Sequence, residues 1–154
     1  MTAKELATGL CKRFEGFYSR PYLCPAGVPT IGFGTIRYEN GVKVTLQDPP
    51  IDRARAEELL AWEIERVCVP ALMRLCPTVD TPERAGALLD FIYNLGSGSL
   101  RASTLRKRVN AEDWDSVPSE LAKWVYGGGR RLKGLEIRRA AEARLCQNEF
   151  DADT

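Results

Sequence analysis

EGFYSRPYLCPAGVPTIGFGT, residues 15–35, decides how the rest of the chain is arranged. Its three prolines exclude a helix, because proline lacks a backbone N–H and clashes with the preceding turn. The part from Thr30 to Thr35 is typical of a strand with glycines on one face, which leaves room for another group to lie against it. Glu15 therefore marks the end of a helix and the start of an irregular, proline-stiffened segment.

A helix is expected before this stretch, and a small sheet within and after it. Thr2 and Glu5 have the spacing of a capping box, and apolar residues follow at helical intervals, so we predict a helix over 3–14. Asn40-Gly41 lies between two short segments and is typical of a two-residue hairpin turn. A small antiparallel sheet should therefore occupy residues 17–46.

The remainder of the chain has the apolar periodicity of helices. Pro70 should break or kink the chain after the long helix that precedes it. Gly127–Gly129 is either a flexible lip or only a connection between helices. We predict helices over the ranges 53–68, 71–76, 82–95, 101–109, 117–126 and 135–146.

This order of elements predicts an α+β fold with segregated elements. We expect one domain, 1–154, with a small antiparallel sheet lobe at about 15–50 and a mainly helical lobe at about 70–146. The acidic end, 147–154, is expected to fray. A ligand is expected between the two lobes, which is a common place for a binding site.

The composition excludes several kinds of chemistry. The chain has 154 residues, no histidine and five cysteines without a CxxC pair, so we expect neither a zinc site nor any other metal or cofactor. Ser-His-Asp and Cys-His mechanisms are excluded because the chain has no histidine. Acid–base chemistry must therefore come from carboxylates, Lys, Tyr or Cys.

The charge is unevenly distributed along the chain. The formal net charge is +1, but residues 1–100 carry 11 bases and 12 acids, whereas residues 101–145 carry 11 bases and 6 acids. The cationic part can attract an anionic polymer, such as nucleic acid or the acidic peptide stems of a bacterial wall. We expect no membrane insertion, because no apolar run approaches the ~20 residues of a membrane span, and no export signal is recognisable.

Glu15 and Thr30 are the candidates for chemistry in residues 15–35. Glycoside hydrolysis needs a protonated carboxyl near the leaving oxygen and a group that positions water or stabilises the transition state. Glu15 can supply the first, and the hydroxyl of Thr30 can hold a water molecule. Nearby aromatic side chains can provide apolar walls that favour a protonated Glu15.

The chain resembles the phage-type lysozymes, the endolysins of glycoside hydrolase family 24, in several segments that occur in the same order. The first is the spacing of Glu15, Cys24 and Thr30, together with FEG around the acid and TIGFG from Thr30 onward. The resemblance covers residues 5–146. The further matching segments are Asp90–Gly96, Ser103–Leu105 with Val109-Asn110, and Gly134-Leu135 with Arg138-Arg139 and Glu142.

This resemblance implies a fold and a reaction. The fold is two lobes joined by a long helix, with the saccharide between them. The reaction is hydrolysis of the β-1,4 bond between N-acetylmuramic acid and N-acetylglucosamine, with Glu15 as general acid, Cys24 at the second catalytic position and Thr30 placing the attacking water. Arg138 or Arg139 is expected to pair with Glu15. The residues expected to contact the substrate are Tyr22, Gly32, Phe33, Asn94 and Arg138.

The resemblance also implies a biological role. The partner is bacterial peptidoglycan and not nucleic acid, and the chain is expected to be a monomer. It would be made in the host cytoplasm, reach the wall in the periplasm after a holin opens the membrane, and lyse the host.

Cys24 is the departure from the family pattern, because many members have Asp there. The thiolate can replace the carboxylate, the neutral thiol can merely hold the water, or another acid can act instead. A small buried cysteine without a catalytic role is a further interpretation, and a disulfide to Cys24 would block the site. Two other functions stay open: a lytic transglycosylase, which needs one carboxyl, and an inactive saccharide-binding protein.

Overall fold

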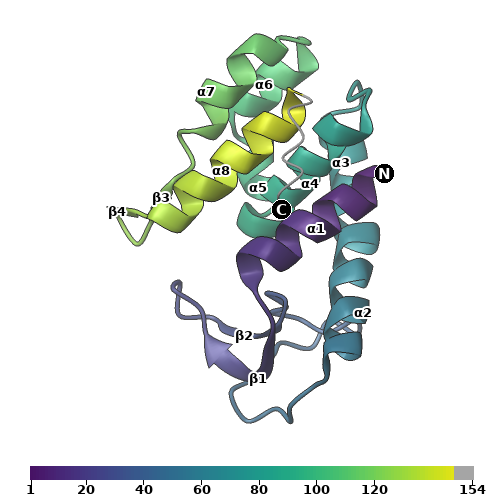
Figure 1. Ribbon diagram of the computed structural model, residues 1–154, viewed down its shortest axis with the longest axis vertical. Helices are drawn as coiled ribbons and strands as arrows, with labels where there is room; N and C mark the ends of the chain where they lie inside the picture. Colours follow the sequence, from purple (N-terminus) through teal and green to yellow (C-terminus); the bar gives the residue numbers. More distant parts are fainter. Residues whose placement is uncertain (148–154) are drawn as a thin grey trace.

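The computed structural model describes residues 1–147, so the predicted fraying of residues 148–154 lies outside the described part. The described chain forms a small lobe around two short strands and a larger lobe of helices, connected by one long helix (Figure 1). This confirms the predicted α+β class and the two-lobed arrangement.

Helix α1, Ala3–Glu15, forms because both of its ends are well capped. The hydroxyl of Thr2 accepts from the backbone N–H of Glu5, and the Glu5 side chain bonds back to Thr2, which completes the predicted capping box. Gly16 ends the helix with φ +71°, a conformation that glycine adopts without strain. Glu15 is therefore held at the junction between the helical lobe and the sheet lobe.

The sheet lobe contains less regular structure than the sequence predicted. Strands β1, Tyr18–Leu23, and β2, Pro29–Gly32, pair antiparallel. The Asn40-Gly41 turn is present, but its flanks make a single bridge, Arg37 to Lys43, instead of two full strands. The predicted sheet over 17–46 is thus a two-stranded hairpin followed by an irregular loop that packs on the long helix.

The long helix has three consecutive parts: α2, Arg53–Glu63, a π-helical segment η1, Ile64–Cys68, and α3, Val69–Leu75. Of the break or kink predicted at Pro70, the break does not occur, because the chain passes through this point without leaving the helical conformation. Buried residues recur every four positions along it, which an α-helix of 3.6 residues per turn cannot keep on one face. The wider π turn corrects this drift. Those residues are Ala56, Leu60, Ile64, Cys68 and Leu72.

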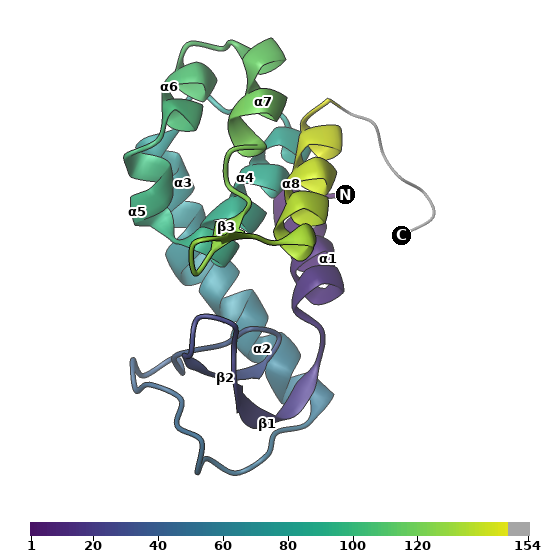
Figure 2. The ribbon, with the colours of Figure 1, turned by 90° about the vertical axis from the view of Figure 1, so that its left-hand side faces the viewer.

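The helical lobe follows the predicted order with shifted boundaries (Figure 2). The helix predicted over 101–109 is two helices, because Ser103 caps a new start. The helix predicted over 117–126 is short, and the glycine run beyond it forms a hairpin. The elements are α4 (Pro82–Leu95), α5 (Ser97–Arg101), α6 (Thr104–Asn110), η2 (Trp114–Ser116), α7 (Val117–Leu121), β3 (Tyr126–Gly127), β4 (Arg130–Arg131) and α8 (Lys133–Cys146).

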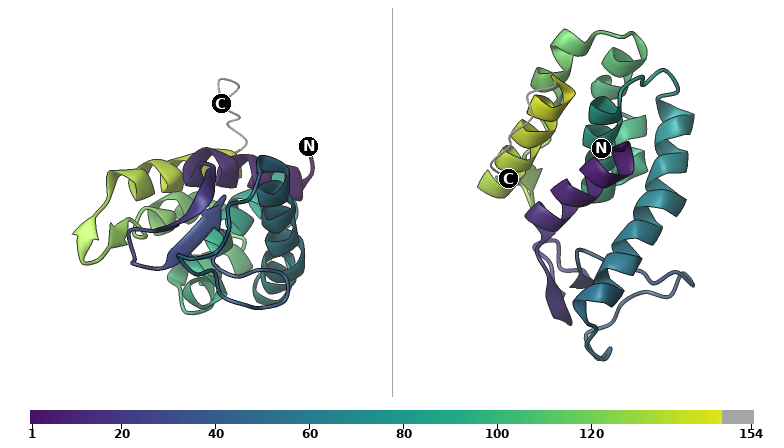
Figure 3. Two further views of the ribbon diagram at one scale, coloured as in Figure 1. Left: turned by 90° about the horizontal axis from the view of Figure 1, so that it is seen from below. Right: turned by 45° about the vertical axis from the view of Figure 1, so that its right-hand side comes forward.

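Helix α4 is the centre of the core. It is buried along most of its length, and α1 and α8 both pack against it, as Figure 3 shows from two further sides. Gly86 permits the close approach of α1, since a Cβ atom there would lie 2.9 Å from the Cβ of Leu6. No helix in residues 1–147 is long and apolar enough to span a membrane. Three helices thus meet where Glu15 ends α1.

Candidate active site

Glu15 is the last residue of α1, and its carboxyl group is held on two sides. Its side chain is 19% exposed, and Oε2 accepts a 2.6 Å hydrogen bond from Nη1 of Arg138. Gly34 lies against the other side: with φ +83°, a Cβ atom there would come within 2.7 Å of Oε1 of Glu15. Position 34 must therefore be glycine if the carboxyl group is to keep this place.

Arg138, from α8, is fixed by a buried carboxylate. Its Nε and Nη2 atoms donate to the two oxygens of Asp90 on α4, each at 2.8 Å, and the thiol of Cys11 donates to the same carboxylate at 3.2 Å. Burial by itself raises the pKa of Asp90, but hydrogen bonds from Arg138 and its positive charge outweigh burial and hold the pKa below its usual range. Asp90 therefore holds Arg138 so that its remaining nitrogen reaches Glu15.

Glu142 and Arg139 extend the network behind Asp90. Burial, followed by the negative charge of Asp90, raises the pKa of Glu142 well above its usual range against the opposing charge of Arg139, so the environment favours the protonated form of Glu142. Arg139 donates to Glu142 at 2.9 Å and to Oδ1 of Asn94 at 2.7 Å. Asp90 was not predicted as a site residue, although an acid on the apolar face of a helix is a signal for such a role.

Cys24 lies in the turn between β1 and β2, and Thr30 lies on β2. Burial by itself raises the pKa of the Cys24 thiol, but hydrogen bonds from the backbone N–H groups of Val28 and Ala26 and from the hydroxyl of Thr30 lower it overall. Thr30 is 2% exposed, and Oγ1 lies 2.8 Å from the carbonyl oxygen of Val28, which accepts the single hydroxyl proton when the sulfur does not. The turn thus stabilises a thiolate at position 24.

Tyr22 lies between Glu15 and the turn that carries Cys24. Burial, followed by the charges of Glu15, Tyr18 and Cys24, raises its pKa to about 12. In the β1–β2 pairing Tyr22 is opposite Thr30, and its ring stacks on that of Tyr18 with centroids 4.0 Å apart. The structure therefore brings Glu15, Tyr22, Cys24 and Thr30 into one region, as the sequence predicted.

Comparison with known proteins agrees with this arrangement. The family model described as phage lysozyme matches residues 12–142, which include the acid, the turn and both buried arginines. The chain belongs to the phage lysozyme family. It is thus a glycoside hydrolase of the lysozyme type, an endolysin that acts on bacterial peptidoglycan.

Individual relatives extend the likeness over almost the whole chain of this lysozyme. A SAR-endolysin of bacteriophage PS119 is 32% identical over 133 residues, which are 86% of this chain and 75% of that protein. An endolysin of Acyrthosiphon pisum secondary endosymbiont phage 1 is 31% identical over 153 residues, 96% of this chain and 99% of that protein. The solved endolysin from Escherichia coli O157:H7 phage FAHEc1 matches with a TM-score of 0.84 at 29% identity, over 97% of this chain and 96% of that chain.

Four of the residues expected to contact substrate have other surroundings in this lysozyme. Phe33 is 1% exposed and belongs to the core, and a Cβ atom on Gly32 would meet Ala56 of α2 at 3.1 Å, so we correct both to packing positions. Arg138 is 4% exposed and faces Glu15 and Asp90, so it positions the acid instead of contacting substrate. The amide oxygen of the half-buried Asn94 is used by Arg139, which favours a structural role.

The state of the cysteines argues against a disulfide at the site. All five thiols are free, and the four other than Cys24 are buried among the helices. Over residues 1–147, no group of three His, Cys, Asp or Glu side chains is placed to hold a metal ion. Among residues 1–147, Cys24 is the one thiol that is not buried.

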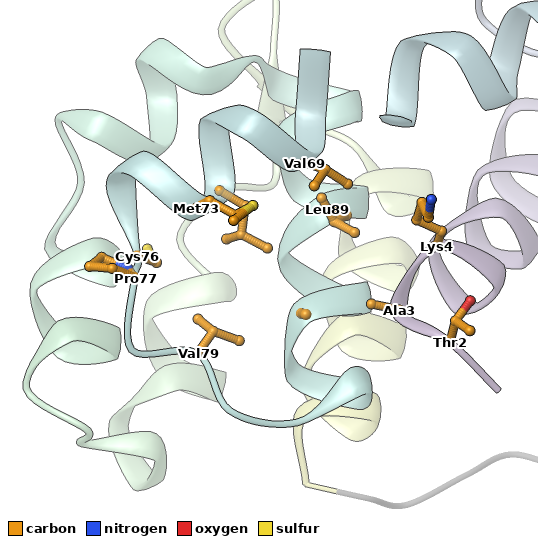
Figure 4. Close-up of a pocket in the computed structure, with 11 residues that line it drawn as sticks. Thr2, Ala3, Lys4, Val69, Met73, Cys76, Pro77, Val79 and Leu89 are labelled. Atoms are coloured by element: carbon orange, nitrogen blue, oxygen red, sulfur yellow. The ribbon is translucent and has the colours of Figure 1, made fainter. Parts of the chain in front are cut away.

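An apolar pocket of about 540 Å³ lies away from this site, between the start of α1 and helices α3 and α4 (Figure 4). Its walls include Val69, Met73, Val79 and Leu89, and the start of α1 closes one side. Neither Glu15 nor Cys24 lines it. The pocket is therefore separate from the catalytic region.

Proposed function

We propose that this endolysin is a muramidase that hydrolyses the β-1,4 bond between N-acetylmuramic acid and N-acetylglucosamine. The observation that carries the proposal is Glu15, a partly exposed carboxyl at a helix end that is held at 2.6 Å by a buried arginine. In this reaction Glu15 donates a proton to the oxygen that links the two sugars. Arg138 fixes the direction from which that proton is delivered.

The turn between β1 and β2, which carries Cys24, is assigned to positioning the attacking water. We assign Cys24, as a thiolate, to the place of the second carboxylate, where it accepts a hydrogen bond from the water or balances the positive charge of the transition state. Thr30 supports this by its hydrogen bond to the sulfur. Tyr22 is assigned to the saccharide, because its half-buried ring lies beside both groups.

The cellular setting of the proposal is host lysis. Relatives with this likeness are named endolysins and SAR-endolysins, and peptidoglycan is the substrate in either case. We propose that the protein acts as a monomer after it reaches the wall, and that a holin provides its route from the cytoplasm.

Glu15→Gln tests the assignment of the acid. We expect clearing of purified cell walls to slow by at least ~100-fold, because a positioned proton donor contributes about that much. The matched control is Glu58→Gln, an exposed acid on α2 that should keep full activity. Both variants should keep the melting temperature of the wild type within a few degrees. A fully active Glu15→Gln variant would overturn the proposal.

The products distinguish hydrolysis from lytic transglycosylation, the alternative that stays open because position 24 is a cysteine and not an acid. A transglycosylase can work without a second carboxylate, and it leaves a 1,6-anhydro sugar instead of a reducing end. Mass spectrometry of the released fragments should show reducing ends. Fragments that carry only 1,6-anhydro ends would reassign the protein as a lytic transglycosylase.

A further inference from the structure

The β3–β4 hairpin is a cationic projection beside the active site. Residues 124–133 contain Arg130, Arg131 and Lys133 and no acid. All three are exposed, and only Arg131 has an ion-pair partner among residues 1–147, the side chain of Glu136. The hairpin therefore presents Arg130 and Lys133 to solvent without a partner in the described part of the chain.

The hairpin has a defined shape. Tyr126–Gly127 pairs with Arg130–Arg131, and the N–H of Leu132 donates to the carbonyl of Val125 at 2.8 Å just below. Gly128 and Gly129 have φ +59° and +77°, which is the backbone of the two-residue turn that favours hairpins. A Cβ atom on Gly127 would lie 2.7 Å from Leu132, so the hairpin is packed onto its own base. The segment predicted to be a lip or a connection is thus a hairpin between α7 and α8.

These charges are in an unfavourable place for stability. Lys133 is the first residue of α8, and the arginines precede it, so all three cations lie at the positive end of the helix dipole. Stability alone would favour acids there. Local conflicts of this kind are expected where a sequence serves a ligand instead of the fold. An anionic ligand would remove the conflict and would also gain the helix dipole.

The hairpin adjoins the start of the helix whose Arg138 holds the acid. Lys133 precedes Arg138 by five residues, which is about 7.5 Å along α8. In Figures 1 and 2 the hairpin lies at the edge of the helical lobe that is nearest to β1 and β2. Tyr126 is 61% exposed on the hairpin and offers an apolar surface beside the charges.

We propose that the β3–β4 hairpin binds the carboxylates of the peptide stems that branch from the glycan strand. This inference rests on the proposed muramidase function, because it requires the glycan to lie beside Glu15. The stems carry free carboxyl groups, and they branch from the sugar next to the bond that is cut. Arg130 and Lys133 bind those carboxylates, while Tyr126 packs against the aliphatic part of the stem.

The test compares two substrates and two double variants. The substrates are intact peptidoglycan and glycan strands from which an amidase has removed the stems. The hairpin variant is Arg130→Gln with Lys133→Gln, and the control is Arg101→Gln with Lys107→Gln, which removes two exposed charges from α5 and α6. We expect KM of the hairpin variant to rise about fivefold on intact peptidoglycan, with kcat unchanged, which is the size of two exposed ion pairs. On stem-free strands its kinetics should equal those of the wild type, and the control should equal the wild type on both substrates.

The outcomes separate this inference from the proposed function. Equal losses on both substrates, no loss on intact peptidoglycan, or the same loss in the control would each overturn hairpin recognition of the stems. If the wild type cuts neither substrate, the muramidase proposal fails, and the hairpin is judged by co-sedimentation alone. In that assay the Glu15→Gln protein should pellet with intact peptidoglycan, and adding the hairpin substitutions should release about fivefold more protein into the supernatant. Unchanged pelleting would overturn the inference.

Discussion

At the scale of single residues, Cys24 is the residue at which this lysozyme departs from the family pattern. Its sulfur receives hydrogen bonds from two backbone N–H groups of the turn and from the Thr30 hydroxyl, and these lower its pKa against the effect of burial. An Asp at this position is ionised over most of the useful pH range, whereas a thiol is ionised only above its own pKa. The acid side of the pH–activity profile should therefore depend on which residue is at position 24.

We predict that kcat/KM of the wild type falls as the pH drops through the pKa of Cys24, because the thiolate takes up a proton there. Cys24→Asp should move this fall to lower pH, since a carboxylate keeps its charge down to about pH 4. Cys24→Ser should lose the fall and be about tenfold less active, because its hydroxyl carries no charge. Initial rates on cell walls between pH 4 and 9 test this, and an unchanged profile in Cys24→Ser would contradict it.

Glu142 gives a second prediction at the residue scale, on stability. Burial and the charge of Asp90 raise its pKa above the value in the unfolded chain, so the folded state holds a proton that the unfolded state releases. The free energy of unfolding should therefore fall as the pH rises from the unfolded pKa towards the folded one. Glu142→Gln keeps the donor to Asp90 and the acceptor for Arg139 without a proton to lose.

We expect Glu142→Gln to be more stable than the wild type at pH 7, by on the order of 1 kcal/mol, and to differ less at pH 4.5. Urea unfolding at the two pH values measures this difference. Glu136→Gln, which removes a partly exposed acid from the same helix, is the control and should show no such gain. A Glu142→Gln variant that is less stable than the wild type at pH 7 would show that Glu142 is ionised in the fold.

At the scale of elements, Pro70 shows how a local preference is met by long-range packing. A proline inside an α-helix clashes with the carbonyl of the preceding turn, so the sequence predicted a break or a kink. The chain instead widens to a π turn over Ile64–Cys68, in which the N–H of Val69 bonds to the carbonyl of Ile64. The same turn keeps Ile64 and Cys68 on the buried face. Packing of the whole face thus outweighed the local preference of one residue.

Because packing sets the π turn, we predict that Pro70→Ala leaves the register of the long helix unchanged. The exposed side chain at position 70 costs nothing to remove, and alanine restores a backbone N–H and a favourable helix propensity. The free energy of unfolding should rise by about 1 kcal/mol, less than the full penalty of proline in a regular helix. Urea unfolding provides the value, and full activity should be retained; a loss of stability would mean that the proline itself holds the π turn.

Capping and turn chemistry explain which elements the sequence predicts well. The helix starts at Thr2 and Thr81 and the helix ends at Gly16 and Gly96 agree with the structure, because each depends on hydrogen bonds between close neighbours in the chain. The sheet was overestimated, because the segments around Asn40-Gly41 pair through only one bridge and a few backbone hydrogen bonds, and Glu39 beside the turn is tied to Arg55 of the long helix. Local signals were sufficient only where the stabilising contacts are local.

The same difference between local and long-range contacts decided which parts of the candidate site were predicted. The spacing of Glu15, Cys24 and Thr30 was predicted from the resemblance to phage-type lysozymes, and one short hairpin carries two of the three. The ties through Asp90 to Arg138 were not predicted, since they join α4 to α8 across 48 positions of the chain. Phe33 was misassigned because a strand of alternating glycines does not reveal which face is covered by α2. Long-range packing therefore decides which predicted residues can reach a substrate.

At the scale of the whole molecule, the five cysteines divide into two classes. Cys11, Cys68, Cys76 and Cys146 are between 0% and 4% exposed, and burial raises the pKa of each thiol. Cys24 lies outside this core, is partly exposed, and has a lowered pKa. Only the thiolate reacts with alkylating agents and disulfide reagents, so both its exposure and its lowered pKa make Cys24 the most reactive of the five thiols.

We therefore predict that a disulfide reagent modifies one thiol in the native protein and five after unfolding in guanidinium chloride. Peptide mapping should place the native label on Cys24, and the labelled enzyme should lose activity, because the adduct occupies the position assigned to the attacking water. Cys24→Ser should then show no fast-reacting thiol. The four buried thiols should react only at the rate of global unfolding, since they pack between helices that separate only when the fold opens. Fast labelling of any of these four in the native protein would mean that the helical lobe opens locally, and that α1 and its terminal Glu15 are less firmly held than the buried network indicates.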